Sequence, residues 1–274
     1  MPITSALPDM ERELRFFPVG SQNSKKLTAA QIQHFNQKGY LFPLDVFTPE
    51  EAGKNRKYFD QLMEKAVQAG HNSYSINGWH RHCHGIYDLC YDDRILDYMT
   101  DLLGENLICT MTHYFSKEPS DGKRVNWHQD ASYWPLTPSK VITVWLAIDD
   151  VDKDNAPMQF IPGSHLHGQI PFEHSKPEEN SVLGQSVHNS EEYGKPVSVI
   201  MKAGQISIHS DLLLHGSEPN MSGRRRCGLT MRYNPPDVRG WDARRAEGII
   251  CRGSDPDGYW QLLPRPDGDH LPTC

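Results

Sequence analysis

The chain has 274 residues, carries 28 Lys and Arg against 35 Asp and Glu for a formal charge of −7, and is 37% hydrophobic. This length predicts one large domain or two small ones, and the apolar content excludes wholesale disorder. The net negative charge argues against nucleic acid as a partner, and no segment approaches the roughly 20 apolar residues that cross a bilayer, so no membrane partner is expected.

The first hundred residues predict helices. Residues 1–26 are polar and aperiodic and are expected to form an arm on the body of the protein. A short helix is expected from Leu27 to Gly39, followed by a strand over 40–44. Thr48-Pro49-Glu50-Glu51 has the capping box and the proline of a helix start, and that helix should run to about residue 69. A third helix is expected over 95–103, ended by Gly104.

From residue 106 onwards the hydrophobic period changes to two. This period predicts strands over 106–115, 140–148, 158–161, 197–201, 205–209 and 228–234. Short strands without intervening helices indicate an antiparallel sandwich or barrel. The long polar insertion at 164–196 is expected to be a functional loop. We predict a single domain over 1–274, with a helical layer (27–104), a β core (105–235) and a C-terminal extension (236–274).

Six cysteines are scattered along the chain, and none forms a Cys-x-x-Cys pair. In a chain of this length that spacing predicts reduced thiols rather than a disulfide framework. The early residues are acidic and lack the apolar run of a secretory signal. We therefore expect a cytoplasmic protein, whose oligomeric state stays open.

A metal site is the first functional hypothesis, because the chain has 14 histidines. A His-x-Asp pair alone is weak, since about one is expected by chance, and two occur. In the first, His128 and Asp130 stand two residues apart, so both side chains can point to one face of an extended chain. With His215 they would supply two imidazoles and one carboxylate, which leave a face of an octahedral iron ion open. The alternative set of metal ligands is His209, Asp211 and His215.

An arginine lies on the predicted strand that follows His215, the third candidate ligand. Arg226 stands eleven residues after His215, on the next predicted strand. Its planar guanidinium could bind a carboxylate with two parallel hydrogen bonds. Its neighbours Arg224 and Arg225 are interpreted as part of a solvated turn.

Four segments taken together carry a family resemblance. They are WHQD at 127–130 with YWPL at 133–136, VWLAIDDV at 144–151, MQFIPGSH at 158–165, and LHGS at 214–217 leading on to Arg226. Over roughly residues 105–235 the chain resembles the phytanoyl-CoA dioxygenase family of iron(II)/2-oxoglutarate oxygenases.

This resemblance implies a fold that is mainly β with N-terminal helices, built as a double-stranded β-helix (a cupin-like jelly roll). It also implies that Fe(II) is held by His128, Asp130 and His215, while Arg226, assisted by Ser217, binds the distal carboxylate of 2-oxoglutarate. The implied reaction is that of a dioxygenase, in which O₂ hydroxylates a C–H bond and succinate and CO₂ are released. Related halogenases lose the carboxylate ligand, so halogenation is not expected here.

One turn departs from the family pattern. Relatives commonly have Asn-Gly-Cys where this chain has Asn155-Ala156-Pro157. Glycine tolerates a positive φ and proline fixes φ near −65°, so we expect the backbone of this turn to differ.

The substrate is expected to be a small polar molecule. An ammonium group could be caged by aromatic side chains, and the candidates are Trp79, Tyr133, Trp134 and Trp145. A phosphonate or carboxylate could meet basic side chains, here Arg81, Lys117 and Arg124. His80 lies in the segment WHRHCH at 79–84, for which a surface loop, a substrate-facing wall and a zinc site are the alternatives.

These candidates favour an aminoalkylphosphonate such as 2-aminoethylphosphonate, because phosphonate-hydroxylating members of the family have a similar length and similar motifs. A natural-product, amino-acid-like or acyl-CoA substrate is the alternative. Two other classes also stay open, a non-oxidative cupin-like metal enzyme and a metal-dependent binding protein.

Overall fold

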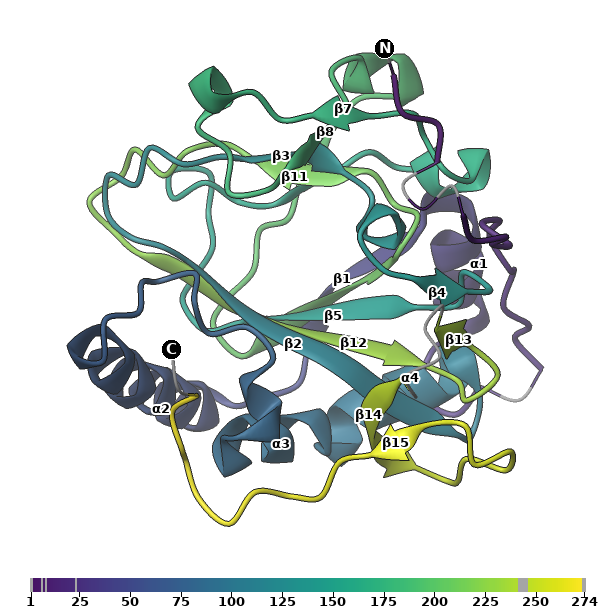
Figure 1. Cartoon of the computed structure of the whole chain (residues 1–274), viewed down its shortest axis with the longest axis horizontal. Coiled ribbons are helices and arrows are strands. Elements are labelled where there is room, and N and C mark those ends of the chain that lie inside the picture. Colours follow the sequence, from purple (N-terminus) through teal and green to yellow (C-terminus); the bar gives the residue numbers. More distant parts are fainter. Residues whose placement is uncertain (1, 6, 8, 23, 241–245, 273–274) are drawn as a thin grey trace.

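Two sheets face each other, and helices cover the outer side of the larger one (Figure 1). The computed structural model describes residues 2–5, 7, 9–22, 24–240 and 246–272. Among these residues no helix is both long enough and apolar enough to cross a membrane. The inner sides of the two sheets bound the space in which the predicted site residues gather.

The three expected helices are confirmed. In α1 (Ala29–Lys38) Thr28 and Gln31 form a capping box, and the helix ends at Gly39, whose φ is +83°. The helix α2 (Pro49–Gln68) begins with the predicted capping box and proline. The third, α4 (Asp93–Leu103), starts two residues earlier than expected because Asp92 caps it.

One helix was not predicted. After a 3₁₀ turn at Trp79–Arg81, the chain forms α3 (His84–Cys90). Neither the surface loop nor the extended zinc-binding segment expected here is present. Instead Ile86, Tyr87 and Cys90 of α3 are buried, so tertiary packing stabilises a helix that lacks a strong capping signal.

The larger sheet has seven strands in the order β1-β10-β5-β12-β2-β14-β15. Its hydrogen-bonded pairs are antiparallel except for β14 with β15. The strands are β1 (Tyr40–Asp45), β2 (Leu107–Lys117), β5 (Ile142–Ala147), β10 (Gln205–Ser210), β12 (Arg226–Asn234), β14 (Glu247–Arg252) and β15 (Gln261–Leu262).

The smaller sheet has four short strands in the order β3-β11-β6-β9. They are β3 (Val125–His128), β11 (His215–Ser217), β6 (Gln159–Phe160) and β9 (Val197–Ser198). Two further pairs are β4 (Leu136–Thr137) with β13 (Arg239–Gly240), and β7 (Glu173–His174) with β8 (Gln185–Ser186). The polar insertion at 164–196 contains β7, β8 and three 3₁₀ turns.

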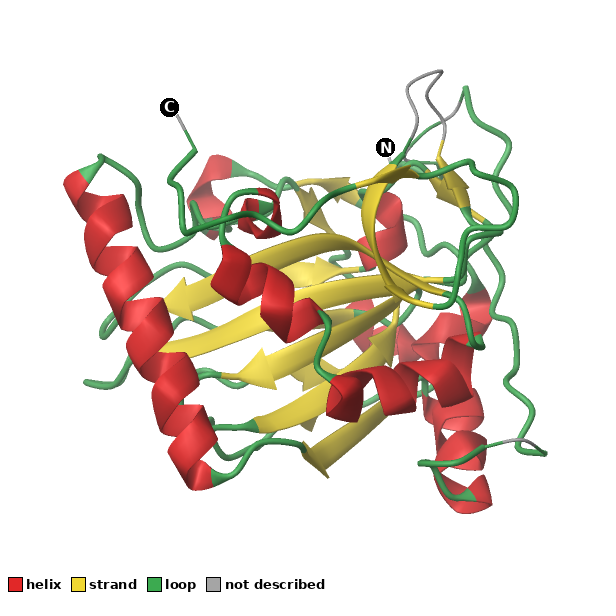
Figure 2. Ribbon diagram, turned by 90° about the horizontal axis from the view of Figure 1, so that it is seen from below, coloured by secondary structure: helices red, strands yellow, loops and turns green. Residues whose placement is uncertain are grey.

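All seven predicted strands are present, including the one over 40–44, but β3, β4, β7, β8, β11, β13, β14 and β15 were not predicted. The fold is mixed α and β, with N-terminal helices and several sheets. The helices lie against the outer face of the large sheet (Figure 2). Their apolar side chains are buried there. Phe59 of α2 and Met99 of α4, for example, are fully buried in one cluster with Leu229 of β12. Each such side chain contributes about 1.5–3 kcal/mol of transfer free energy.

Candidate metal centre

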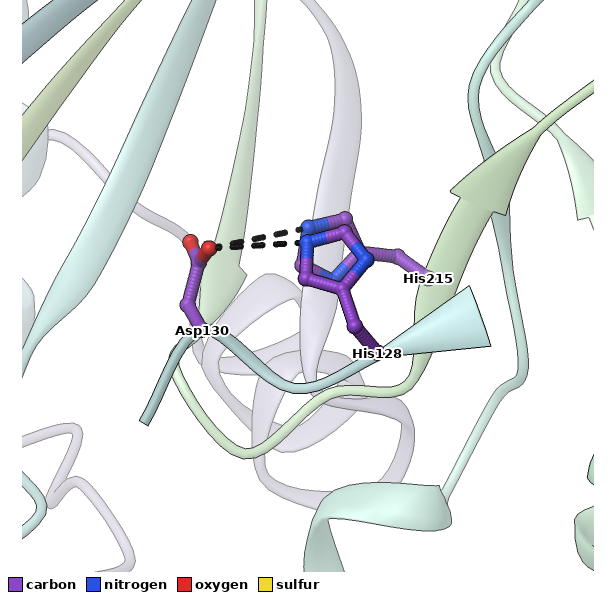
Figure 3. Close-up of side chains that lie close together, drawn as sticks. All are labelled: His128, Asp130 and His215. Carbon is purple, nitrogen blue, oxygen red and sulfur yellow. Dashed lines mark ion pairs between the residues drawn. The ribbon is translucent and has the colours of Figure 1, made fainter. Parts of the chain in front are cut away.

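The pairing of two short strands brings the three candidate ligands together. His128 ends β3 and lies directly opposite His215, the first residue of β11, with the two ring centroids 4.1 Å apart. Asp130 follows in a 3₁₀ turn and faces both rings (Figure 3). Its Oδ1 is 3.7 Å from His128 Nε2 and 3.9 Å from His215 Nε2. All three side chains are buried.

Hydrogen bonds orient both imidazoles towards this centre. The Nδ1 of His128 lies 2.8 Å from the carbonyl of Asn126, and that of His215 lies 2.9 Å from the carbonyl of Leu213. A carbonyl only accepts, so Nδ1 carries the proton and the Nε2 lone pairs face Asp130. Burial lowers the pKa of His215 well below its ordinary value, which keeps the imidazole neutral, as a metal ligand must be.

The carboxylate of Asp130 is also held in its ligating form. Burial alone would raise its pKa, but the neighbouring side chains of His128, His209 and Arg232 together hold the pKa well below the ordinary value. The hydroxyl of Thr143 donates to Oδ2 at 2.8 Å, which leaves Oδ1 turned towards the imidazoles. Two neutral nitrogens and one carboxylate oxygen form the donor set that suits Fe(II) with open positions for other ligands.

The rival set of ligands is not assembled. His209 approaches Asp130, with its Nε2 3.8 Å from Oδ2. Asp211 instead accepts a hydrogen bond from the Ser139 hydroxyl at 2.7 Å. Among the described residues, His128, Asp130 and His215 are the one group of three that could hold a metal ion.

The three side chains open onto a cavity between the two sheets. Its cavity volume is about 40 Å³, below the usual range for small-molecule sites. Its lining consists of Phe115, Val125, His128, Asp130, Thr143, Trp145, Met158, His209, His215, Gly216, Ser217, Arg226, Thr230 and Arg232. A larger groove lies beneath the N-terminal arm, but none of the predicted site residues lines it.

Arg226 brings a buried positive charge into this cavity. Its Nε donates to the carbonyl of Ala156 and its Nη2 to the hydroxyl of Ser217, both at 3.1 Å. No carboxylate of a described residue forms an ion pair with it, and burial lowers its pKa to about 10. A buried guanidinium with only neutral partners is suited to an incoming carboxylate, so the residues present fit 2-oxoglutarate.

The turn beside Arg226 differs from the sequence expectation. Ala156 has a φ of +60°, the left-handed conformation that glycine favours. The chain therefore keeps a positive φ at this position, even though alanine replaces glycine, at a cost of about 1 kcal/mol. This conformation accompanies the hydrogen bond from the Arg226 side chain to the Ala156 carbonyl.

Trp145 forms one wall of the cavity and is also buried. Its indole lies against the backbone of β12, where a Cβ added to Gly228 would be 2.0 Å from the ring. The guanidinium of Arg226 lies 5.8 Å from the centre of the same ring. Glycine at position 228 thus gives Trp145 the room to lie between the strand and the cavity.

The other predicted substrate residues do not line the cavity. Trp79 is buried in the core beneath the helices, and His80 is hydrogen-bonded to the Thr112 hydroxyl at 2.9 Å. The three basic side chains already have partners. Arg81 forms an ion pair with Glu247, and Arg124 forms one with Glu218. The Nζ of Lys117 donates to the backbone carbonyls of Lys123, Ser217 and Glu218. The ring of Tyr133 contacts that of His128 at 5.8 Å, while Trp134 packs against Arg232.

Sequence reasoning missed two polar residues of this cavity. Thr143 holds Asp130, and Arg232 is a second buried guanidinium, whereas His209, a member of the alternative ligand set, lies beside Asp130 as a residue near the site. A usable signal existed for Arg232, because it stands six residues after Arg226 on one strand, and even spacing places both side chains on the same face.

Comparison with known proteins supplies the family. The phytanoyl-CoA dioxygenase (PhyH) family matches residues 35–228. A relative from Stutzerimonas stutzeri, named "Probable alpha-ketoglutarate-dependent hypophosphite dioxygenase", is 27% identical over 234 residues, which are 77% of this chain and 79% of that protein. A Caenorhabditis elegans protein named "Probable phytanoyl-CoA dioxygenase" is 24% identical over 241 residues, 77% of each chain. The solved structure of the non-heme monooxygenase ThoJ in its apo form is 27% identical, with a TM-score of 0.75, and the match covers 86% of this chain and 88% of that one.

The chain therefore belongs to the phytanoyl-CoA dioxygenase family. It is a 2-oxoglutarate-dependent non-haem iron dioxygenase that uses Fe(II), and the buried group of two histidines and one aspartate agrees with that class. The non-oxidative metal enzyme and the metal-dependent binding protein are not retained.

Proposed function

We propose that this enzyme hydroxylates an aliphatic C–H bond of a small polar substrate. His128, Asp130 and His215 hold Fe(II), and Arg226 with Ser217 binds the distal carboxylate of 2-oxoglutarate. The observation that carries this proposal is the shared cavity, in which the three ligands and an Arg226 side chain without an acidic partner are buried together.

Iron, 2-oxoglutarate and O₂ supply the oxidising power, and the overall reaction converts substrate, 2-oxoglutarate and O₂ into hydroxylated substrate, succinate and CO₂. The chain contributes position and exclusion of water. Arg226 and Ser217 orient the co-substrate, while Thr143 fixes the carboxylate of Asp130. Apolar lining from Phe115 and Met158 limits the access of water to the reacting atoms.

For the substrate we propose an aminoalkylphosphonate, with 2-aminoethylphosphonate as the first compound to test. The relative named for hypophosphite, another phosphorus oxyanion, supports its anionic half. The ammonium half has less support, because Trp79 packs in the core away from the cavity, and Trp134 and Trp145 already lie beside Arg232 and Arg226. A natural-product, amino-acid-like or acyl-CoA substrate is the alternative.

The test has two stages. Anaerobic titration of the Fe(II)-loaded protein with 2-oxoglutarate should produce a visible metal-to-ligand charge-transfer band. Succinate release is then measured with 2-aminoethylphosphonate, β-alanine, ethanolamine and an acyl-CoA, and a gain of one oxygen atom is sought by mass spectrometry. Absence of the band in iron-loaded protein contradicts the assigned site, and stimulation by acyl-CoA alone contradicts the small polar substrate.

We also propose that residues 1–274 form one domain built as a double-stranded β-helix. β1 from the predicted helical layer and β14 from the predicted extension both join the sheet that contains the core strands, which supports a single unit.

A cytoplasmic location is supported by the five described cysteines, which are buried free thiols, whereas Cys274 lies outside the described residues.

A further inference from the structure

A second buried arginine lines the cavity and forms no ion pair with a described residue, although the charge of Asp130 acts on it. The side chain of Arg232 is 7% exposed, and its Nε has no hydrogen-bond partner. Its guanidinium forms neither a hydrogen bond nor an ion pair with any described residue and instead lies 5.3 Å from the centre of the Trp134 ring. A buried cation is costly unless an anion meets it, so an unpaired guanidinium in a cavity is a feature of a binding site.

Arg232 and Arg226 serve opposite ends of this cavity. Six residues separate them on β12, which is roughly 20 Å of extended strand. Arg226 begins the strand beside Ser217 and Trp145. Arg232 pairs across the sheet with Thr143, the residue that holds Asp130. A co-substrate anchored at Arg226 therefore approaches the metal centre from one end and leaves Arg232 at the other.

The charges of the residues that line the cavity also favour an anionic substrate in addition to the co-substrate. The lining contains one carboxylate, Asp130, and two guanidinium groups, Arg226 and Arg232, and imidazoles that bind a metal ion are neutral. Fe(II) adds two positive charges and 2-oxoglutarate adds two negative ones. The loaded cavity thus keeps about one unit of positive charge, which a substrate with one negative charge would neutralise.

Building on the proposed function, we propose that Arg232 anchors an oxyanion of the substrate, a phosphonate or a carboxylate, at the end of the cavity away from Arg226. The planar guanidinium can donate two parallel hydrogen bonds to such a group. Stacking on Trp134 limits the orientations of the guanidinium. In this role Arg232 sets substrate specificity. It was not among the basic residues that the sequence analysis proposed for substrate binding.

The test is a binding measurement that needs no turnover. Protein loaded with Ni(II) and saturated with 2-oxoglutarate, so that Arg226 is occupied, is titrated calorimetrically with methylphosphonate, acetate and the neutral tetrahedral compound dimethyl sulfone. We expect the oxyanions to bind and dimethyl sulfone not to bind, and the stronger of the two oxyanions identifies the substrate class. The Arg232→Met variant should lose about 30-fold or more of oxyanion affinity while its affinity for 2-oxoglutarate stays within about three-fold.

A matched control removes an arginine whose charge is already paired. Arg224 is exposed and bound by both oxygens of Asp152, so Arg224→Met should leave oxyanion binding unchanged. Should Arg232→Met fail to fold, Arg232→Lys keeps the charge without the planar fork and is expected to weaken binding by about ten-fold.

Three outcomes would overturn the inference. The first is equal oxyanion affinity in the wild-type protein and the Arg232 variant, and the second is no preference of the wild-type protein for oxyanions over dimethyl sulfone. The third is a variant in which 2-oxoglutarate binding is weakened instead, because Arg232 would then serve the co-substrate. None of these results affects the charge-transfer band of the iron-loaded wild-type protein, so a failure of this inference is distinguishable from a failure of the proposed function.

Discussion

Replacing Arg226 should change stability and ligand binding in different ways. Arg226 is 3% exposed, and among the described residues its guanidinium donates hydrogen bonds to a carbonyl and a hydroxyl and lies beside the Trp145 ring. Burial lowers its pKa from the ordinary value to about 10. At ~1.4 kcal/mol for each pKa unit, burial of this charge costs about 3 kcal/mol relative to water. The cost is present without 2-oxoglutarate and is offset when a carboxylate binds.

In the Arg226→Met variant an unbranched apolar side chain takes the place of the charge. We expect the free energy of unfolding of the metal-free protein to stay unchanged or to rise by up to about 3 kcal/mol, because no ion pair is lost. The dissociation constant for 2-oxoglutarate should rise about 30-fold or more, since the charge-assisted hydrogen bonds to its distal carboxylate disappear. Iron affinity should not change.

Urea unfolding of the metal-free proteins measures the first effect, and anaerobic titration of the visible band measures the second. Arg225→Met is the control, because Arg225 forms ion pairs with Asp149 and Asp60. That variant should lose stability but keep its affinity for 2-oxoglutarate. The reasoning is refuted if Arg226→Met loses several kcal/mol of stability and binds 2-oxoglutarate as the wild-type protein does.

Three further predictions concern the metal centre and its surroundings. His128→Ala should lose bound iron, measured by elemental analysis, with an unchanged far-ultraviolet circular dichroism spectrum; one retained iron per chain would contradict the ligand assignment. Thr143→Val removes the hydroxyl that orients Asp130 and should weaken iron binding about 10- to 100-fold in a chelator competition. Burial raises the pKa of Asp211 to about 7, so the folded protein holds a proton that the unfolded chain releases near pH 4. This contribution to the stability of the metal-free protein is complete below about pH 4 and is lost as the pH rises through 7. The Asp211→Asn variant should lack this loss. The prediction is contradicted if the free energy of unfolding, measured with urea between pH 5 and 8, depends on pH equally in the wild-type protein and the variant.

Local chemistry was enough to predict the elements with strong sequence signals. The capping box at Thr48 and the glycine at the end of α1 act within a few residues of the chain, so the helix starts and stops they indicate were found. The alternating pattern of β12 likewise belongs to a single strand. The triad motif was visible for a similar reason, since His128 and Asp130 are two residues apart and the aromatic residues around them form a recognisable pattern.

Elements without a local signal were missed. The three-residue strand β11 and the four-residue β3 are too short for a hydrophobic period, and they exist because they pair with each other. The helix α3 has no side-chain cap and is held by the burial of Ile86 and Cys90. Such elements depend on contacts between distant parts of the chain, which a window of sequence does not contain.

The use of each basic and aromatic side chain depended on strand pairing. Lys117 and Arg81 looked available in the sequence, but the fold places them against backbone carbonyls and Glu247. Arg232 was not a candidate in the sequence analysis, yet the pairing of β12 with β5 places it opposite Thr143 beside the metal centre. Residue types and short spacings thus supplied the metal-site hypothesis, and the family resemblance of the motifs around them implied the reaction class. The residues that meet the substrate were decided by how strands far apart in the chain pair, since that pairing determines which side chains share the buried cavity and which of them find partners elsewhere.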